Sequence, residues 1–213
     1  MKERINPDHI YYIKLGKKGQ FEEDCINNGY LELNYHEVPH DLCLIGDFSA
    51  AVKYLGVDKT QGSLSNHARQ VKTFYTASEN DLWITFFKNE MWWCFSRPEI
   101  DRTENNTKRR RASWSNEDIQ GNRLDFSHLS GNLLKTQEYR GTISEIKDTK
   151  DYLIRKINAE DTKQVSDAKQ TFKSLKGSIK NLLQLLHPKD FEILIDLIFQ
   201  RGGWRRTSTI GGT

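Results

Sequence analysis

The chain has 213 residues, of which 36% are hydrophobic and 29% charged, and its 32 Lys and Arg against 29 Asp and Glu give a formal net charge of +3. No run of about 18 apolar residues occurs, which excludes a membrane-spanning helix, and the start Met1-Lys2-Glu3-Arg4 is not followed by the apolar segment of a signal peptide. We therefore expect a cytoplasmic protein without membrane contact, folded as one large or two small domains.

The first third of the chain alternates predicted strands and short helices. Residues 10–15 and 30–35 have the composition of strands. Between them, residues 21–28 form a predicted helix with acidic residues in its first turn and Gly29 at its end. Two further helices are predicted over residues 48–55 and 63–75, the second from apolar residues at helical spacing.

The most aromatic part of the chain is a predicted hairpin. Residues 82–87 and 91–95 have the composition of strands, joined by a turn at Lys88-Asn89-Glu90. Residues 98–122 are polar and charged, residues 124–134 predict a turn and a short helix, and residues 139–146 predict a last strand. We expect an α+β fold, a small mixed sheet or barrel with short helices, that ends near residue 158.

The remainder of the chain predicts helices. Apolar residues at three- and four-residue steps predict a long helix over residues 161–186, which ends before Pro188. A second helix over residues 191–199, capped by Asp190, ends at Gly202-Gly203, and residues 204–210 predict the first strand of another sheet. We divide the chain into a domain of residues 1–158, a connecting helix of residues 159–187, and the start of a further domain at residues 188–213.

Cysteines and histidines give no sign of a metal site or a disulfide. Cys25, Cys43 and Cys94 are an odd number without a C-x-x-C pair, so we expect reduced, mostly buried thiols. The six histidines are scattered, and none has metal-ligand spacing to another His or a Cys on one helix face. We expect no metal and no cofactor in this chain.

The aromatic hairpin supplies candidate base-binding residues. If Trp83, Phe95 and one of Trp92 and Trp93 face the same way, they line a slot that stacks an extruded base, with Trp114 as a further wall. The alternative is that these side chains are core, because strand aromatics are usually buried and adjacent strand residues point to opposite faces.

A basic block supplies candidate phosphate contacts. Lys108-Arg109-Arg110-Arg111 lies in the polar stretch, and Arg69 and Lys72 lie in the helix predicted over residues 63–75. Such residues suit a phosphate backbone, because each contacted phosphate releases condensed counterions. The alternative for the block is a solvated loop.

The C-terminal residues resemble part of a nuclease family. Leu186-His187-Pro188-Lys189-Asp190-Phe191-Glu192, an apolar helix, Gly203-Trp204, a basic pair and Gly211-Gly212 follow one another as at the opening of an Mrr-like restriction endonuclease domain of the PD-(D/E)XK type. In that family a metal-binding Asp and a Glu/Gln-x-Lys strand follow, so the resemblance implies Mg²⁺ for a full-length nuclease. Glu192 corresponds to a position that such families sometimes place near the metal, although a first-turn carboxylate also stabilises a helix.

The N-terminal region resembles PUA/EVE/YTH-like modules, which cap modification-dependent restriction enzymes. Ser65-Asn66-His67-Ala68-Arg69-Gln70, then Asn80-Asp81 and Trp83-Ile84-Thr85-Phe86, are similar to an EVE pattern. Asn80 replaces a Gly of that pattern, and Ser65 stands where the pattern has Arg. The order of parts along the whole chain is also similar to the leader region of a family of bacterial restriction endonucleases.

Together these features predict the DNA-binding specificity module of a restriction endonuclease, with cleavage by a nuclease core missing from this chain. The partner would be double-stranded DNA from which one modified or otherwise preferred base is extruded, and a homodimer is compatible with this role. One alternative is a non-enzymatic reader of RNA or modified RNA, which would use the same slot and basic residues. Another is a protein-interaction adaptor whose long helix pairs with a partner.

Overall fold

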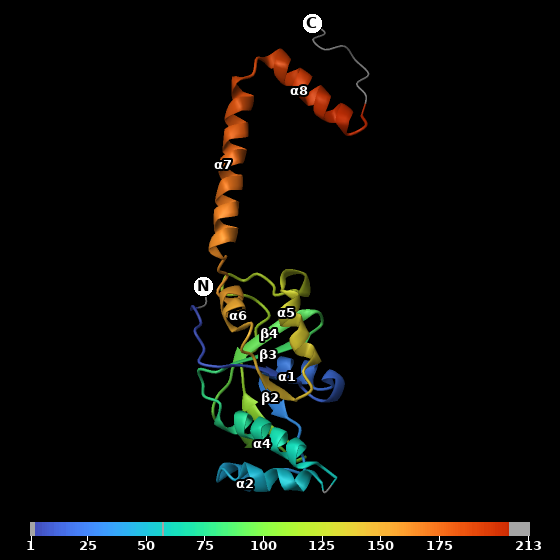
Figure 1. The fold of residues 1–213 in the computed structure, drawn as a ribbon, viewed down its shortest axis with the longest axis vertical. Coiled ribbons are helices and arrows are strands. Elements are labelled where there is room, and N and C mark those ends of the chain that lie inside the picture. Colours follow the sequence, from blue (N-terminus) through green and yellow to red (C-terminus); the bar gives the residue numbers. More distant parts are fainter. Residues whose placement is uncertain (1–2, 57, 205–213) are drawn as a thin grey trace. The chain divides into compact units, whose positions relative to one another are not determined.

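The computed structural model describes residues 3–56 and 58–204 of the chain, which divides into two compact units. Unit 1 comprises residues 1–160, and unit 2 comprises residues 161–213. Unit 1 contains two small open sheets and several helices, whereas the described part of unit 2 is helical (Figure 1). The α+β class expected from the sequence is confirmed.

The larger sheet of unit 1 has four strands in the order β4-β3-β1-β7. Its strands are β1 (Ile10–Ile13), β3 (Leu82–Phe87), β4 (Glu90–Phe95) and β7 (Ile143–Glu145). Strand β1 pairs in parallel with β3 and antiparallel with β7, and β3 and β4 form the predicted aromatic hairpin. The inner strands β1 and β3 are almost wholly buried, as strands covered on both faces are. The last strand, β7, is shorter than the predicted strand of residues 139–146.

The smaller sheet has three antiparallel strands in the order β2-β6-β5. These strands are β2 (Tyr30–Leu33), β5 (Asp101–Arg102) and β6 (Lys108–Arg111). The basic block is therefore the central strand of a sheet. Its side chains alternate, so that Lys108 and Arg110 are fully buried while Arg109 is half-buried and Arg111 exposed.

Short helices surround the two sheets. They are α1 (Glu22–Asn28), α2 (His40–Leu44), α3 (Phe48–Ala51), α4 (Gln61–Thr76), α5 (Gly131–Leu134) and α6 (Lys150–Ile157), with 3₁₀ turns at Lys17–Gly19, Val52–Leu55, Phe126–His128 and Lys135–Glu138. Helix α4 begins at the cap Thr60, whose side chain accepts a hydrogen bond from the Ser63 N–H at 3.3 Å. It buries Gln70, Val71 and Phe74. Helix α6 was not predicted from the sequence.

Two hydrophobic clusters fill unit 1, one on each face of the β3–β4 hairpin. Trp83 and Cys94 belong to one cluster, and Ile84 and Trp93 belong to the other. The three cysteines are buried free thiols, as predicted.

The described part of unit 2 consists of α7 (Lys163–Leu185) and α8 (Pro188–Arg201). Thr162 caps α7 by accepting a hydrogen bond from the Val165 N–H at 3.4 Å. Helix α8 has Pro188 at its first position and His187 as its cap, so the predicted cap Asp190 lies inside the first turn instead. The strand predicted for residues 204–210 lies, beyond Trp204, outside the described residues. In the described chain, no helix combines the length and apolar character needed to cross a membrane.

The buried ammonium group of Lys108 is bound by main-chain oxygens. Lys108 Nζ donates hydrogen bonds to the carbonyl oxygens of Tyr35 at 2.7 Å, of Asn106 at 2.8 Å and of Val38. Burial lowers the pKa of Lys108 to about 8, which still leaves the group protonated at neutral pH. The ammonium thus ties β6 to the segment that follows β2, and it is not available to phosphate.

The buried guanidinium of Arg110 closes the end of α4. It donates to the carbonyl oxygens of Phe74 at 2.9 Å, Ala77 at 2.8 Å and Arg97 at 2.8 Å. The last carbonyls of a helix have no partner within the helix, so a cation there satisfies them and also interacts favourably with the helix dipole. The prediction that Lys108 and Arg110 contact phosphate is therefore wrong, because both cations bind carbonyls of the core.

Replacing Arg110 should destabilise unit 1 far more than replacing its neighbour. Arg110→Ala leaves three carbonyls without their donor and opens a cavity, so we expect the free energy of unfolding to fall by about 3–5 kcal/mol. Arg111→Ala, which alters an exposed side chain in the same strand, should change it by no more than about 0.5 kcal/mol. Urea denaturation followed by tryptophan fluorescence measures both values, and similar losses would contradict this assignment.

Candidate nucleic-acid interface

The register of the aromatic hairpin separates the residues predicted to form one slot. Lys88 and Asn89 form a two-residue turn with φ values of 51° and 61°, and the strands pair Trp83 with Cys94 and Leu82 with Phe95. Because successive side chains point to opposite faces of a strand, Trp83 and Phe95 lie on opposite faces of the sheet. The prediction that these two residues face the same slot is wrong.

Two of the five candidate aromatics are core residues. The Trp83 side chain is fully buried, with its ring 5.1 Å from the ring of Tyr11 and 6.1 Å from that of Phe74. Trp93 is 7% exposed, and its indole N–H donates to the Glu117 carbonyl at 2.8 Å. Neither ring can be approached by a base without opening the core.

The other three aromatics are half-buried. Trp114 packs against the cluster that contains Trp83, and its indole N–H donates to the Tyr30 carbonyl at 3.0 Å. Trp92 Nε1 is buried and has no hydrogen-bond partner within residues 3–56 and 58–204. Phe95 lines a surface pocket. The five aromatics therefore do not enclose one site.

The remaining candidate phosphate contacts differ in their exposure to solvent and in whether their charge is already paired. Arg109 Nε donates to the buried carboxylate of Glu32 at 2.7 Å, and its guanidinium lies 4.0 Å from the centre of the Tyr30 ring. Arg69 and Lys72 are exposed on α4, where Arg69 binds the Asn66 side chain at 2.8 Å. These two residues and the exposed Arg111 remain accessible to a polyanion.

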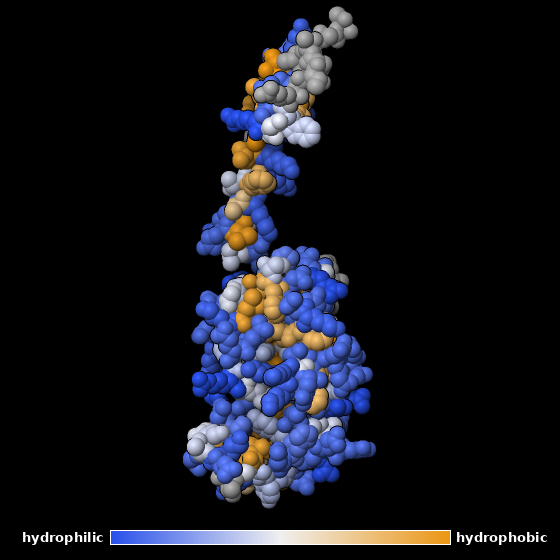
Figure 2. Space-filling model, turned by 90° about the vertical axis from the view of Figure 1, so that its right-hand side faces the viewer, coloured by the Kyte–Doolittle hydropathy of each residue, from blue (hydrophilic) through white to orange (hydrophobic). Residues whose placement is uncertain are grey.

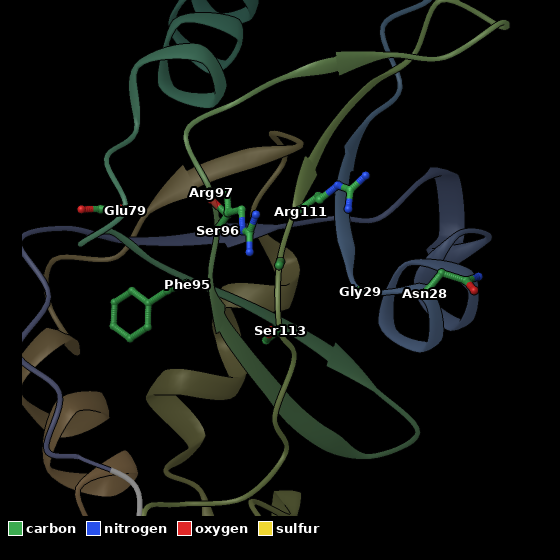
Figure 3. A pocket seen from close by; sticks show the side chains of 9 residues that line it. Asn28, Gly29, Glu79, Phe95, Ser96, Arg97, Arg111 and Ser113 are labelled. Carbon is green, nitrogen blue, oxygen red and sulfur yellow. The ribbon is translucent and has the colours of Figure 1, made fainter.

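Phe95 and Arg111 are brought together at one pocket of about 470 Å³, named here the Phe95 pocket (Figure 3). The Arg97 N–H donates to the Arg111 carbonyl at 2.8 Å, so the two arginines stand side by side on adjacent segments. The Ser96 side chain is 3% exposed, and its Oγ has no hydrogen-bond partner in the described chain. The pocket is lined by Asn28, Gly29, Glu79, Phe95, Ser96, Arg97, Arg111, Ala112 and Ser113.

A second pocket, of about 370 Å³, lies where β1 and β2 end and β7 approaches; we name it the basic pocket. Its lining consists of Lys14, Gly16, Lys17, Lys18, Asn34, Tyr35, Arg140, Gly141 and Thr142. Four of these residues are cationic, and among the described lining residues there is no carboxylate. Lys17, Lys18 and Arg140 are exposed, whereas Lys14 is half-buried and donates to the Tyr139 carbonyl.

The wall of the basic pocket is held by a hydrogen-bond network from α4. Gln70 is 2% exposed, and its Oε1 accepts from the N–H groups of Thr142 at 2.6 Å and Ile143 at 3.0 Å. The Tyr35 hydroxyl lies 2.9 Å from His67 Nδ1. Since burial lowers the pKa of His67, its ring is neutral near pH 7, and Nδ1 can accept the Tyr35 proton. The helix segment that resembles the EVE pattern thus positions two sides of this pocket.

Backbone geometry requires a glycine at one position of the lining, Gly16. Gly16 has φ +84°, and a Cβ built there would lie 2.4 Å from a ring carbon of Phe21, so no other residue fits. Asn34 also lines this pocket, and its Oδ1 is buried and has no hydrogen-bond partner among the described residues. A buried acceptor without a donor is costly, so a turn of the Asn34 side chain that brings this oxygen to a ligand N–H in the pocket would be favourable.

Glu192 does not belong to either pocket. It is exposed on α8, but because this helix begins at Pro188, Glu192 lies beyond the first turn, whose carboxylate is Asp190; the expectation of a first-turn position for Glu192 is wrong. Within the described chain, no group of three or more His, Cys, Asp and Glu side chains is placed to hold a metal ion. The Mg²⁺ that the nuclease resemblance implies for a full-length protein stays a prediction.

Sequence reasoning missed most of the basic pocket. Lys17 and Lys18 lie between the predicted strand of residues 10–15 and the predicted helix of residues 21–28, and Lys14, Asn34 and Arg140 lie within predicted strands, so none was a candidate. Three lysines within five positions after the first strand were a signal that could have been used, because cations crowded on a turn imply an anionic partner. Asn34 gave no such signal.

Comparisons of the chain with models of protein families, with curated proteins and with solved structures find no match.

Removing the Gln70 amide should loosen the wall of the basic pocket. Gln70→Ala leaves two main-chain N–H groups without their acceptor, which we expect to cost about 1–3 kcal/mol of stability. Asn66→Ala, one turn earlier on the exposed side of α4, is the matched control and should cost no more than about 0.5 kcal/mol. Hydrogen exchange at the amides of Thr142 and Ile143 tests the cause directly, because only the Gln70 variant should accelerate it.

Acid should destabilise unit 1 partly through His67. Its pKa is lowered in the folded protein by burial, with Lys59 adding to the effect, so the unfolded chain binds more protons below the usual His pKa of about 6.5. Stability is thus retained above this pH and falls as the pH drops through it. His67→Asn removes this titration and should lose less stability than the wild type between neutral pH and about pH 5. Urea titrations at both pH values measure the difference, and equal losses would contradict the prediction.

Proposed function

We propose that unit 1 is the DNA-binding specificity module of a restriction endonuclease and that the basic pocket receives one base extruded from the duplex. The observation that carries this proposal is the pocket itself. It combines four cations with a buried acceptor, Asn34 Oδ1, that has no partner in the described chain. In a nucleotide, the phosphate would pair with the cations, and an N–H on the edge of the base would donate to the Asn34 oxygen.

The cations account for affinity. Lys17, Lys18 and Arg140 are exposed at the pocket, so they can contact backbone phosphates on either side of an extruded nucleotide. Each neutralised phosphate releases counterions, which makes such binding strong at low salt and independent of sequence. Because no carboxylate lines the described pocket, no like charge opposes the phosphates.

The polar floor accounts for selectivity. The pocket volume of about 370 Å³ is in the range of small-molecule sites, and the Asn34 amide and Thr142 hydroxyl offer hydrogen bonds to a base edge. Extrusion costs a few kcal/mol, which the pocket contacts must offset. Tyr35 is the aromatic residue of this lining, so recognition depends on hydrogen bonds more than on the tryptophan slot first predicted.

We propose double-stranded DNA and not RNA as the ligand because of the C-terminal residues, which lie outside the pocket. The basic pocket alone suits a nucleotide of either kind, because phosphate and a base edge are common to both. The resemblance of residues 186–213 to the opening of a restriction nuclease favours DNA, and it assigns cleavage to a nuclease domain and not to unit 1.

Charge removal at the basic pocket should weaken DNA binding for all sequences. For Lys17→Ala combined with Lys18→Ala, we expect roughly tenfold or greater loss of affinity for a fluorescent duplex at low salt. The slope of log K against log salt should flatten by about 0.9 for each phosphate that the variant no longer neutralises. Fluorescence anisotropy at several salt concentrations measures both.

Two control variants locate the site. Lys53→Ala combined with Lys135→Ala removes two exposed lysines that do not line the basic pocket and should leave the salt slope unchanged. Arg97→Ala combined with Arg111→Ala removes the arginines of the Phe95 pocket. If only this second pair flattens the slope, the phosphate site lies at the Phe95 pocket and the assignment to the basic pocket is wrong.

Removing the Asn34 amide should change selectivity and leave the salt slope intact. With Asn34→Ala, the preference between duplexes carrying unmodified, methylated or hydroxymethylated cytosine should shrink by about 1–3 kcal/mol, the value of a good base contact. The salt slope should stay that of the wild type, because the same phosphates are still neutralised. Tighter binding of the wild type to single-stranded RNA than to every duplex would instead support an RNA reader.

A further inference from the structure

Helix α7 carries a narrow apolar stripe that is exposed along its whole length. The stripe consists of Val165, Ala168, Phe172, Leu175, Ile179 and Leu182, and Leu186, the residue that caps the helix, continues its spacing. Phe172 is 67% exposed, Leu175 55% and Leu182 64%, and no side chain of α7 is buried. Figure 2 shows hydrophobic residues along this helix between hydrophilic ones.

The spacing of the stripe is that of a coiled coil. Its steps alternate strictly between three and four residues through three heptads, with Val165, Phe172, Ile179 and Leu186 at position a and Ala168, Leu175 and Leu182 at position d. A helix that covers a globular core has a wider apolar face, with a third apolar position in each heptad. In the first two heptads of α7, the flanking positions are instead Lys169, Thr171, Lys176 and Ser178.

Without a partner, α7 is a poor helix. Gly177 lies in its interior and costs about 1 kcal/mol relative to Ala, and the neighbouring Ser174 and Ser178 also have low helix propensity. Most helix stability in proteins comes from tertiary packing of the apolar face and not from propensity, and α7 has no such packing in the described chain. A second surface must therefore cover the stripe.

We infer that the second surface is α7 of another copy of this chain, in a parallel two-stranded coiled coil. Positions e and g flank the seam and set the orientation. In a parallel pair, Lys169 and Lys176 at position e face the neutral g residues Gln164 and Thr171.

An antiparallel pair is disfavoured by charge. The antiparallel alignments that pair most of the stripe bring Lys176 opposite Lys169 or Lys176 of the other copy. Lys169 already binds Asp161 at 2.6 Å, so Lys176 is the residue whose charge decides between the two orientations. Helix α8 also exposes apolar side chains, among them Leu197 at 54%, but these lack a heptad repeat.

The oligomeric state of the full chain tests the pairing. Sedimentation equilibrium should give a dimer for the wild type and a monomer for Leu175→Glu combined with Ile179→Glu, with helical circular dichroism also reduced. The matched control, Ser174→Glu combined with Asn181→Glu, makes the same change of charge on the outer face of α7 and should remain a dimer. A monomeric wild type, or a dimer that survives the stripe variant, would overturn the inference, and so would dissociation by Leu197→Glu on α8.

A cysteine placed in the seam tests the orientation. Leu182→Cys should form a disulfide-linked dimer on mild oxidation, because a parallel pair places residue 182 of one copy opposite residue 182 of the other. An antiparallel pair separates the two sulfurs by roughly 15 Å or more at 1.5 Å per residue, which prevents the bond. The wild type is the control, since Cys25, Cys43 and Cys94 are buried. A dimer that sediments normally but does not cross-link would refute the parallel arrangement.

Discussion

The two cations buried in β6 hold unit 1 in its shape. Lys108 binds three carbonyls around the segment that follows β2, and Arg110 binds the last carbonyls of α4 together with the carbonyl of Arg97. A buried charge is tolerated only where its hydrogen-bonding capacity is filled, and each of these groups donates to three main-chain oxygens. Strand β6, whose sequence looks most suited to nucleic acid, thus uses two of its cations to bind carbonyls inside the core. Of the four cations in β6, Arg111 alone is exposed, and the other surface charge available to a ligand comes from other segments.

The geometry of both pockets depends on Lys108 and Arg110. Lys108 fixes the carbonyl of Tyr35, whose side chain lines the basic pocket, and Arg110 fixes the carbonyl of Arg97, whose side chain lines the Phe95 pocket. Arg110 also anchors the end of α4, the helix from which Gln70 and His67 hold the wall of the basic pocket. Pocket geometry and core stability are therefore coupled, and a variant in β6 that lowers ligand binding would do so through the fold. This is why lysines and arginines on the pocket rims, which have no such supporting role, are the informative ones to remove.

The sequence was sufficient for elements defined by an apolar period and insufficient for those defined by distant partners. Helices α4 and α7 follow from their periodicity and the hairpin strands from their aromatic and β-branched composition. Strand β6 has no apolar period, and its burial depends on the carbonyls of residues 35, 38, 74 and 77. The prediction that Trp83 and Phe95 lie on the same face of the hairpin was wrong because the turn is one residue shorter than expected. A three-residue turn at 88–90 was expected, but the two-residue turn Lys88-Asn89 fixes the register that puts Trp83 and Phe95 on opposite faces. The basic pocket joins residues near 16, 34 and 141, which no local pattern connects.

The proposed pairing of α7 would raise the affinity of unit 1 for DNA, because it joins two copies of the proposed base-binding pocket. Unit 1 is held firmly up to Asn158, which bonds both main-chain groups of Ile5 at 2.9 Å, and α7 begins only a few residues later at Lys163. In a parallel pair, both copies of unit 1 are joined to the same end of the coiled coil, so one DNA molecule can meet two basic pockets. When the linkage lets both sites bind, the second event is intramolecular, and avidity can exceed single-site affinity by roughly 10²–10⁴. A modest preference for one base in each pocket then multiplies across two sites, which gives a specificity module a physical reason to dimerise.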